Sequence, residues 1–346
     1  MEQVRWAVVG AGGIARRRTI PEGIVAADNA TLAAVYSPRS GSAVAQEYGV
    51  IHCETYEQLL EQEIDAVYIA TPTFLHRDQV AQAAAAGKHA LCEKPLALDP
   101  GLAQEMVDVC EKAGVKLGVG LMMRFQSCHQ EAKKLIGEGV IGKPVFGRAQ
   151  LSCWYPPIEG AWRQLPDRGG GGCLADLGVH CIDLLEMFFG RTRRVMAMAG
   201  HAVHRYDIED TAVVLLEFES GATGVVDCLF SVPDESSLNR LELYGSKGSI
   251  LAEGTIGQEG PGTMTLRAGE PATGYESKQQ HDGAGGVAVS PEQTNVYRAQ
   301  IEAFSRAIIE GVEPPVPGCD GLWNQRVLQA CYQSAKTGHA VDPSAV

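Results

Sequence analysis

Short apolar runs alternate with amphipathic stretches through the first third of the chain. Runs rich in β-forming residues lie at 4–9, 31–36, 64–70, 89–92 and 115–119, and helical stretches lie at 14–27, 42–48, 77–86 and 99–113, with a further short helix within 53–60. The first helical stretch contains Pro21, so we expect an interruption there. Strands that alternate with helices predict an α/β fold with a parallel sheet and right-handed crossovers.

The pattern changes after about residue 120. Strands are predicted at 145–154, 194–203, 211–219, 222–232, 238–245, 248–252 and 263–267, and helices at 127–138, 175–189, 293–310 and 319–337. Ser220-Gly221 between two of these strands is a hairpin signal. This half predicts an α+β domain with a large, mostly antiparallel, open sheet. We therefore expect domains at 1–122 and 123–346, with the C-terminal helix packing back on the first.

A glycine-rich turn follows the first apolar run. Residues 10–15 read GAGGIA, which is G-x-G-x-x-A between a predicted strand and a predicted helix. Gly10 permits the tight turn, Gly12 lets the backbone approach a pyrophosphate, and Ala15 lets the helix pack on the strand. This is the pattern of a Rossmann dinucleotide-binding domain, and the alternative is a flavodoxin-like sheet with an empty turn. We expect the phosphates to be bound by Gly10, Gly12, Gly13 and Ile14.

The ends of the next strands are expected to face the same ligand, because ligands bind at the carboxyl ends of parallel strands. The second strand ends at Ser37 and Arg39, without the Asp or Glu that holds the ribose of NAD. Ser37 can donate to a 2′-phosphate and Arg39 can pair with it, so NADP(H) is favoured and NAD(H) remains possible. In the alternative, Arg39 is a solvated turn residue. Further cofactor contacts are expected from Thr71, Pro72, His76, Glu93 and Lys94.

A second group of polar residues follows the glycines at 169–172. Asp176, His180 and Asp183 are spaced i, i+4 and i+7, which places them on one face of an α-helix. The spacing fits a histidine acid/base oriented by a carboxylate, and it also fits a surface pair with no catalytic role. The glycines would let a substrate approach the helix closely.

Composition narrows the range of partners. The 346 residues include 42 acidic and 29 basic side chains, a net charge of −13. This balance opposes binding to nucleic acids and acidic membranes. The absence of a long apolar stretch or a signal-like start predicts a cytoplasmic protein. The ten cysteines show no CxxC pair, so we expect thiols and no metal site.

The sequence resembles the glucose–fructose oxidoreductase / inositol dehydrogenase / MocA family nearly from end to end. The resemblance rests on the glycine turn and on the segments 71–76, 93–95, 120–125, 171–183 and 334–338. It implies a homodimer or homotetramer that carries out pyridine-nucleotide oxidoreduction of sugars, polyols or related cyclic diols. It also implies a catalytic group of Lys94, Asp176 and His180. One departure is Thr73, where many relatives carry Asn. Trp154-Tyr155 and residues 161–163 look closest to sugar and anhydrosugar reductases and dihydrodiol dehydrogenases.

On this reading, His180 transfers the proton, Asp176 orients His180, and Lys94 polarises the reacting oxygen or relays the proton. The substrate is expected to contact Arg124, Trp162, Arg163, Asp176 and His180, although Arg124, Trp162 and Arg163 also fit packing or domain-interface roles. Two other classes share the fold. One is a binding protein that senses the nucleotide without turnover, and the other is a glycosidase that uses tightly held NAD.

The loop after the second strand generates a direct prediction. Arg39→Ala should weaken NADPH binding much more than NADH binding, because only NADPH carries the phosphate that Arg39 would pair with. Dissociation constants from nucleotide fluorescence measure this. Equal losses for both cofactors, or a wild-type chain that prefers NADH, would contradict our interpretation of the loop.

Overall fold

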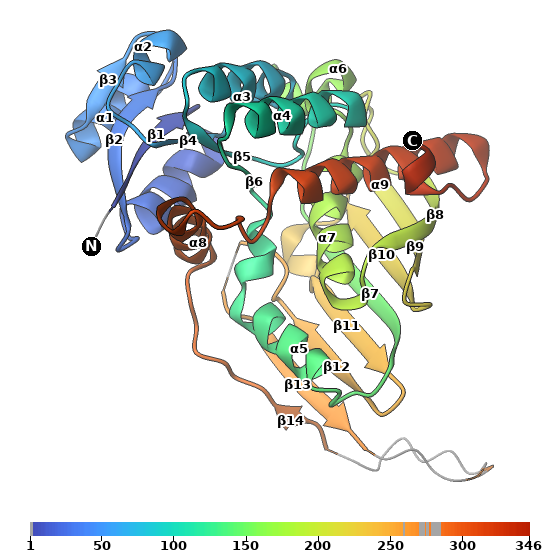
Figure 1. Cartoon of the computed structure of the whole chain (residues 1–346). Coiled ribbons are helices and arrows are strands. Elements are labelled where there is room, and N and C mark those ends of the chain that lie inside the picture. The colour runs from blue at the N-terminus through green and yellow to red at the C-terminus, as the bar shows by residue number, and fades with distance from the viewer. Residues whose placement is uncertain (1–2, 259, 270–273, 275–276, 278–284) are drawn as a thin grey trace.

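A computed structural model describes residues 3–258, 260–269, 274, 277 and 285–346. It contains two sheets, one built from the N-terminal part of the chain and one from the C-terminal part (Figure 1). The first sheet has six strands in the order β3-β2-β1-β4-β5-β6, and all of its pairings are parallel. Its strands are β1 (Val4–Val9), β2 (Ala30–Tyr36), β3 (Ile51–Cys53), β4 (Ala66–Ile69), β5 (His89–Cys92) and β6 (Leu117–Val119).

This strand order is that of a Rossmann sheet, as the alternation of strands and helices predicted. The strands place their carboxyl ends along one edge, and the helices cover the two faces. The connecting helical segments are η1 (Ala15–Ile24), α1 (Gly41–Tyr48), α2 (Tyr56–Leu60), η2 (Thr73–Leu75), α3 (His76–Ala85) and α4 (Pro100–Ala113).

Two local predictions for this half are wrong. Pro21 does not interrupt its helix, because the segment Ala15–Ile24 is a continuous π-helix whose wider turns accommodate the ring. The short strand β3 was not expected. Three residues are too few to show a strand periodicity, and β3 is held by its parallel pairing with the end of β2.

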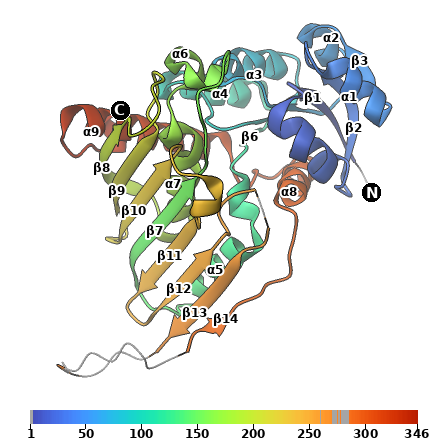
Figure 2. The same cartoon turned by 180° about the vertical axis from the view of Figure 1, so that it is seen from behind.

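The second sheet has eight strands in the order β14-β13-β12-β11-β7-β10-β9-β8. It is antiparallel except for the parallel pair of β7 and β10. Helices cover one face, and the other face is open in the view from behind (Figures 1 and 2). The strands are β7 (Pro144–Ser152), β8 (Thr192–Gly200), β9 (Thr211–Phe218), β10 (Thr223–Leu229), β11 (Arg240–Gly245), β12 (Gly248–Glu253), β13 (Thr263–Ala268) and β14 (Val287–Ala288). The two-residue strand β14 was not predicted.

Helix α7 packs closely on this sheet. An ideal Cβ built on Gly147 of β7 would lie 2.3 Å from the ring of Phe189 and 2.9 Å from Leu185, so the glycine lets the helix approach. The same helix follows η5, and both precede β8. The remaining helical segments are η3 (Met122–Phe125), α5 (Ser127–Gly137), η4 (Trp162–Gln164), α6 (Pro166–Gly169), η5 (Leu174–Gly178), α7 (Val179–Phe189), η6 (Asp234–Ser236), α8 (Val296–Glu310), α9 (Gly318–Thr337) and η7 (Pro343–Ala345).

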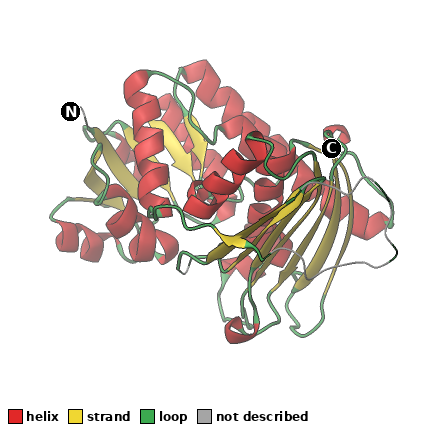
Figure 3. Ribbon diagram, turned by 90° about the horizontal axis from the view of Figure 1, so that it is seen from below, coloured by secondary structure: helices red, strands yellow, loops and turns green. Residues whose placement is uncertain are grey.

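The last two long helices both contact the first sheet, and α9 also contacts the second. Helix α8 packs against η1, and Trp6 Nε1 of β1 donates a buried hydrogen bond of 3.0 Å to Ser305 Oγ. Helix α9 packs against α4 on one side and β8 on the other. The two sheets and their helices therefore lie against one another (Figure 3). No helix among the described residues is long and apolar enough to span a membrane.

The contact of α7 with β7 can be tested by filling the space beside Gly147. Gly147→Ala should destabilise the protein by about 1–3 kcal/mol, because the added methyl overlaps buried side chains. Gly137→Ala is the matched control, since nothing lies within 4 Å of its ideal Cβ. Urea unfolding measures both variants. A Gly147→Ala protein as stable as the control variant would contradict close packing at this point.

Candidate functional site

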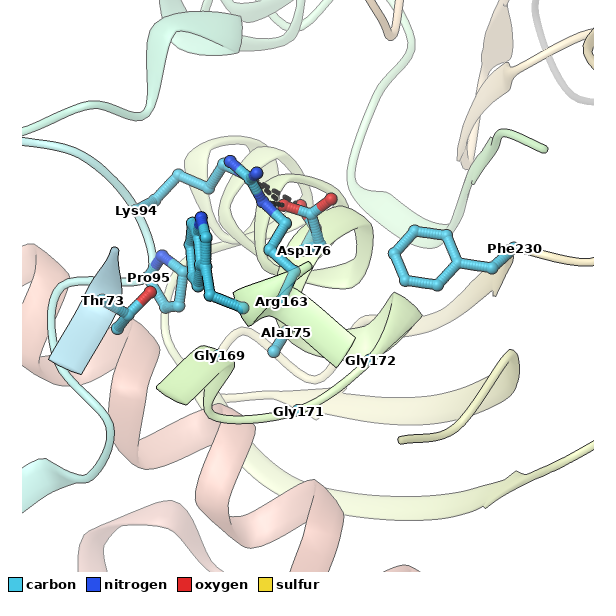
Figure 4. A pocket seen from close by; sticks show the side chains of 11 residues that line it. Thr73, Lys94, Pro95, Arg163, Gly169, Gly171, Gly172, Ala175, Asp176 and Phe230 are labelled. Carbon is cyan, nitrogen blue, oxygen red and sulfur yellow. Dashed lines mark hydrogen bonds and ion pairs between the residues drawn. The ribbon is translucent and has the colours of Figure 1, made fainter. Parts of the chain in front are cut away.

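A pocket with about 280 Å³ of empty space opens where the carboxyl end of β5 meets the loop before α7. Figure 4 shows the lining side chains gathered around the carboxylate of Asp176. The pocket is lined by Thr73, Lys94, Pro95, Trp162, Arg163, Gly169, Gly171, Gly172, Ala175, Asp176 and Phe230.

Lys94 and Asp176 form the central contact of the pocket. Lys94 Nζ donates to Asp176 Oδ1 at 2.7 Å and to the Asp176 backbone oxygen at 2.8 Å. Lys94 lies just after β5 of the first sheet, and Asp176 lies in η5 above the second sheet, so the bond joins the two parts of the molecule. An ammonium group has three donors. Two are used here, and one remains for a ligand oxygen.

Arg163 adds a second cation beside Asp176. Its Nε lies 3.8 Å from Asp176 Oδ1, and its Cζ lies 4.4 Å from the centre of the Trp162 ring. Burial disfavours the charged carboxylate, but Lys94 and Arg163 outweigh it and hold the pKa of Asp176 below its usual range. Asp176 is therefore ionised at neutral pH and keeps Lys94 in place.

His180 lies in α7 and is 6% exposed. Its Nδ1 is buried and has no hydrogen-bond partner among the described residues. Burial, reinforced by the charge of Lys94, lowers its pKa to about 3, so the imidazole is neutral near pH 7. We expected Asp176 to orient His180, but Asp176 is bonded to Lys94 instead. Asp176 lies in the π-helical segment η5 and His180 in α7, so the i, i+4 spacing of a regular α-helix does not apply.

Asp183 and Arg124 form a separate cluster. Arg124 donates from Nη2 and Nε to Asp183 at 2.6–3.0 Å and from Nη1 to Asp320 at 2.7 Å. The Arg124 side chain is 18% exposed, and the Asp183 side chain is 2% exposed. Arg124 does not line the pocket. These contacts favour the domain-interface role for Arg124 over contact with the substrate.

Glu93 is half-buried and His76 is buried, and both hold the strand ends. Tyr68 donates to Glu93 Oε1 at 2.5 Å, and the Lys94 backbone N–H donates to Glu93 Oε2 at 3.2 Å. His76 is 1% exposed, and its ring nitrogens lie 3.0–3.2 Å from backbone oxygens of Thr71, Pro95 and Leu96. Because His76 is buried, any effect that it has on a cofactor passes through the segments that it holds.

The glycine-rich turn has room for a ligand. Gly10 has φ +85°, and its ideal Cβ would lie 2.8 Å from the Ala70 oxygen, so a side chain does not fit there. Above Gly12, by contrast, the nearest atom to an ideal Cβ is Ser40 Oγ at 4.0 Å. The space is thus open where a pyrophosphate would approach, and the residues present fit a dinucleotide. The helical backbone begins at Gly13 and Ile14.

The end of β2 lies beside this turn. Ser37 Oγ is 2.9 Å from Ser40 Oγ, and Ser40 Oγ donates to the Ala11 oxygen at 2.7 Å. Arg39 is exposed and makes no ion pair within the described part of the chain. Sequence reasoning missed Ser40, although its position at the start of a predicted helix was a visible signal. Across the described residues, no group of three or more His, Cys, Asp or Glu side chains is arranged to bind a metal ion.

The glycines before η5 serve the protein's own packing. An ideal Cβ would lie 1.9 Å from Tyr332 Oη at Gly171 and 1.9 Å from the Glu209 backbone oxygen at Gly172. Glu209 also accepts hydrogen bonds from the Gly172 N–H and from Tyr332. We expected these glycines to let a substrate approach closely, and both line the pocket. Tyr332 and Glu209, however, occupy the space that a side chain at either position would need. No local pattern marks Glu209, Tyr332 or Phe230 in the sequence.

Comparison with known proteins assigns both halves of the chain. Residues 4–121 match the family model described as "Oxidoreductase family, NAD-binding Rossmann fold", and residues 129–251 match the "GFO/IDH/MocA C-terminal domain". The chain is 32% identical to the 1,5-anhydro-D-fructose reductase of Ensifer adhaerens, with 98% of each chain covered. It is 31% identical to D-xylose 1-dehydrogenase (NADP(+)) 2 of Haloferax volcanii, over 97% of this chain and 98% of the relative. The crystal structure of aldose-aldose oxidoreductase from Caulobacter crescentus complexed with glycerol superposes with a TM-score of 0.87, at 28% identity over 99% of this chain and 100% of the other.

The charge state of His180 can be measured directly. Because its pKa is lowered to about 3, the imidazole should stay neutral from pH 8 down to pH 5 in ¹⁵N NMR, with the signal assigned through His180→Gln. Lys94→Met should raise that pKa, since it removes a cation that opposes protonation. A His180 signal that titrates between pH 6 and 7 in the wild-type chain would contradict the buried, neutral imidazole.

Proposed function

Because the chain belongs to the GFO/IDH/MocA oxidoreductase family, we propose that it is an NADP(H)-favouring dehydrogenase or reductase that acts on a CH–OH group of a sugar, anhydrosugar, inositol or related cyclic diol. Two relatives at more than 30% identity are named as a reductase of 1,5-anhydro-D-fructose and a dehydrogenase of D-xylose, and both cover nearly the whole chain. The observation that carries the proposal is the bond of Lys94 to Asp176 in the pocket. It places one charged donor where the cofactor-side strands meet the second sheet.

The residues supply proton handling and polarisation. The bound nicotinamide supplies the redox chemistry by exchanging a hydride with the carbinol or carbonyl carbon. The remaining N–H of Lys94 donates to the reacting substrate oxygen. His180 is not among the residues that line the pocket, and we propose that its neutral imidazole exchanges the proton with a bound substrate through its ring lone pair. Asp176 holds Lys94 in place, while Trp162 and Arg163 contact the substrate at the pocket wall.

The cofactor proposal rests on the turn and the loop beside it. The open space above Gly12 fits a pyrophosphate, and unpaired Arg39 provides the charge for a 2′-phosphate. The H. volcanii relative is named for NADP(+). NAD(H) remains the second cofactor that this loop can accept, because no bulky side chain stands in place of Ser37.

We also propose a homodimer or homotetramer formed through the open face of the eight-stranded sheet. Apolar side chains of neighbouring strands are exposed there, with Met198 at 79%, Leu215 at 52%, Met196 at 46% and Val213 at 41%. Met196 pairs with Leu215, and Met198 pairs with Val213, so the four form one patch. A contiguous apolar patch on a sheet face is typical of a protein–protein interface.

Steady-state turnover with a panel of ketoses, inosose, anhydrofructose and aldoses, followed by NADPH absorbance, tests the proposal. His180→Ala and Lys94→Ala should each lower turnover about 10²–10⁴-fold, the usual contribution of a positioned proton-transfer group. Cofactor affinity should change little in His180→Ala, because His180 lies on α7 and not in the glycine turn.

The control is His201→Ala, an exposed histidine that should leave turnover unchanged. Near-wild-type turnover in His180→Ala would remove this residue from the chemistry. NADPH binding without stoichiometric consumption on any substrate would indicate a nucleotide-sensing protein. Sugar hydrolysis with no net cofactor consumption would indicate a glycosidase that retains NAD.

A further inference from the structure

Ser40 precedes helix α1, but its hydroxyl does not cap that helix. It occupies the N-cap position, and its side chain accepts no hydrogen bond from the helix N–H groups. A serine at an N-cap usually accepts such a bond. Here the Ser40 hydroxyl donates to the backbone oxygen of Ala11, inside the glycine-rich turn, at 2.7 Å. The end of β2 is therefore tied to the turn where the dinucleotide phosphates are expected.

This bond fixes the direction of the next one. A serine hydroxyl has one hydrogen to donate and two lone pairs that accept. Ser40 uses its hydrogen on Ala11, since a carbonyl oxygen only accepts. In the 2.9 Å contact between Ser37 Oγ and Ser40 Oγ, the donor is therefore Ser37. Ser37 Oγ has no other hydrogen-bond partner among the described residues, so it faces any ligand as an acceptor.

Both hydroxyls lie at the edge of the space proposed for the cofactor. Ser40 Oγ is the nearest heavy atom to an ideal Cβ on Gly12, at 4.0 Å, and Ser37 remains 8% exposed. The two pyridine dinucleotides differ at the ribose 2′ position. There NAD(H) carries a hydroxyl that can donate, and NADP(H) carries a phosphate whose oxygens accept. The direction of the Ser37 hydroxyl thus distinguishes the two cofactors.

We propose that Ser40 is a positioning residue that sets cofactor selectivity by holding Ser37 as an acceptor. Ser37 then accepts from the ribose 2′-hydroxyl of NAD(H), as an Asp or Glu does in NAD-binding sheets, but without the negative charge that repels a 2′-phosphate. The phosphate of NADP(H) is recognised by Arg39 and gains no hydrogen bond from Ser37. This differs from the expectation that Ser37 donates to the phosphate, and it rests on the proposed function, because a dinucleotide must occupy the turn.

Ser40→Ala tests the proposal through the ratio of two dissociation constants, measured for NADPH and NADH by fluorescence. Without Ser40 Oγ, the Ser37 hydrogen is free to point at a 2′-phosphate. The ratio should shift about 3–10-fold in favour of NADPH, the usual effect of one hydrogen bond. Loss of the bond to Ala11 loosens the turn, but it affects both cofactors equally and cancels in the ratio.

Three further variants separate selectivity from structure. Ser40→Thr keeps the hydroxyl and should keep the wild-type ratio. Ser42→Ala, an exposed serine on the same helix, should also leave the ratio unchanged. In a Ser37→Ala background, Ser40→Ala should add no further shift, because Ser40 acts only through Ser37.

The dissociation constants for NADPH and NADH also show which of the two proposals fails. An equal loss of both cofactors in Ser40→Ala, a shift toward NADH, or a shift that persists without Ser37 would overturn the role of Ser40. A wild-type chain that binds neither NADPH nor NADH would instead overturn the proposed function. The two failures are therefore distinguishable in the same titrations.

Discussion

The bond between Lys94 and Asp176 connects the two halves of the molecule at the point where both contribute to the pocket. Lys94 follows β5 of the parallel sheet, and Asp176 lies in η5 beside the second sheet. A half-buried ion pair is weak evidence for stability, because the cost of removing both charges from water offsets their attraction. Its effect is mainly geometric. With two of its ammonium donors bound to the ionised Asp176, Lys94 is held in one position.

The surroundings of this pair come from contacts far apart in the sequence. Glu93 and His76 fix the strand ends below Lys94, while Glu209 and Tyr332 fix the segment that leads into η5. Buried polar groups that are fully hydrogen-bonded give a rigid local structure. Two exceptions near the pair are His180 and Thr73, since the buried His180 Nδ1 and Thr73 Oγ1 have no hydrogen-bond partner among the described residues.

The sequence predicted most strands and helices correctly, because each carries a local signal. The run Val4–Val9 and the run His89–Cys92 were found with their observed bounds. The prediction at Pro21 was wrong because it assumed an α-helix. Asp176 is bonded to Lys94 and lies in a π-helical segment, where the i, i+4 spacing of an α-helix does not apply. Of the expected site residues, the structure places Lys94, Trp162, Arg163 and Asp176 around one pocket. The partners of Arg124, and the roles of Glu209 and Phe230, depend on long-range contacts that no local pattern encodes.

The return of α8 to the first sheet has a consequence for synthesis of the chain. Ile301 and Phe304 belong to the same buried cluster as Trp6 and Ile24, which lie near the start of the sequence. That cluster is incomplete until the ribosome has added nearly 300 further residues, which takes on the order of tens of seconds. During that interval the nascent N-terminal half exposes an apolar face, and chaperones that bind apolar surfaces have time to reach it. In the completed protein, α8 covers this apolar face.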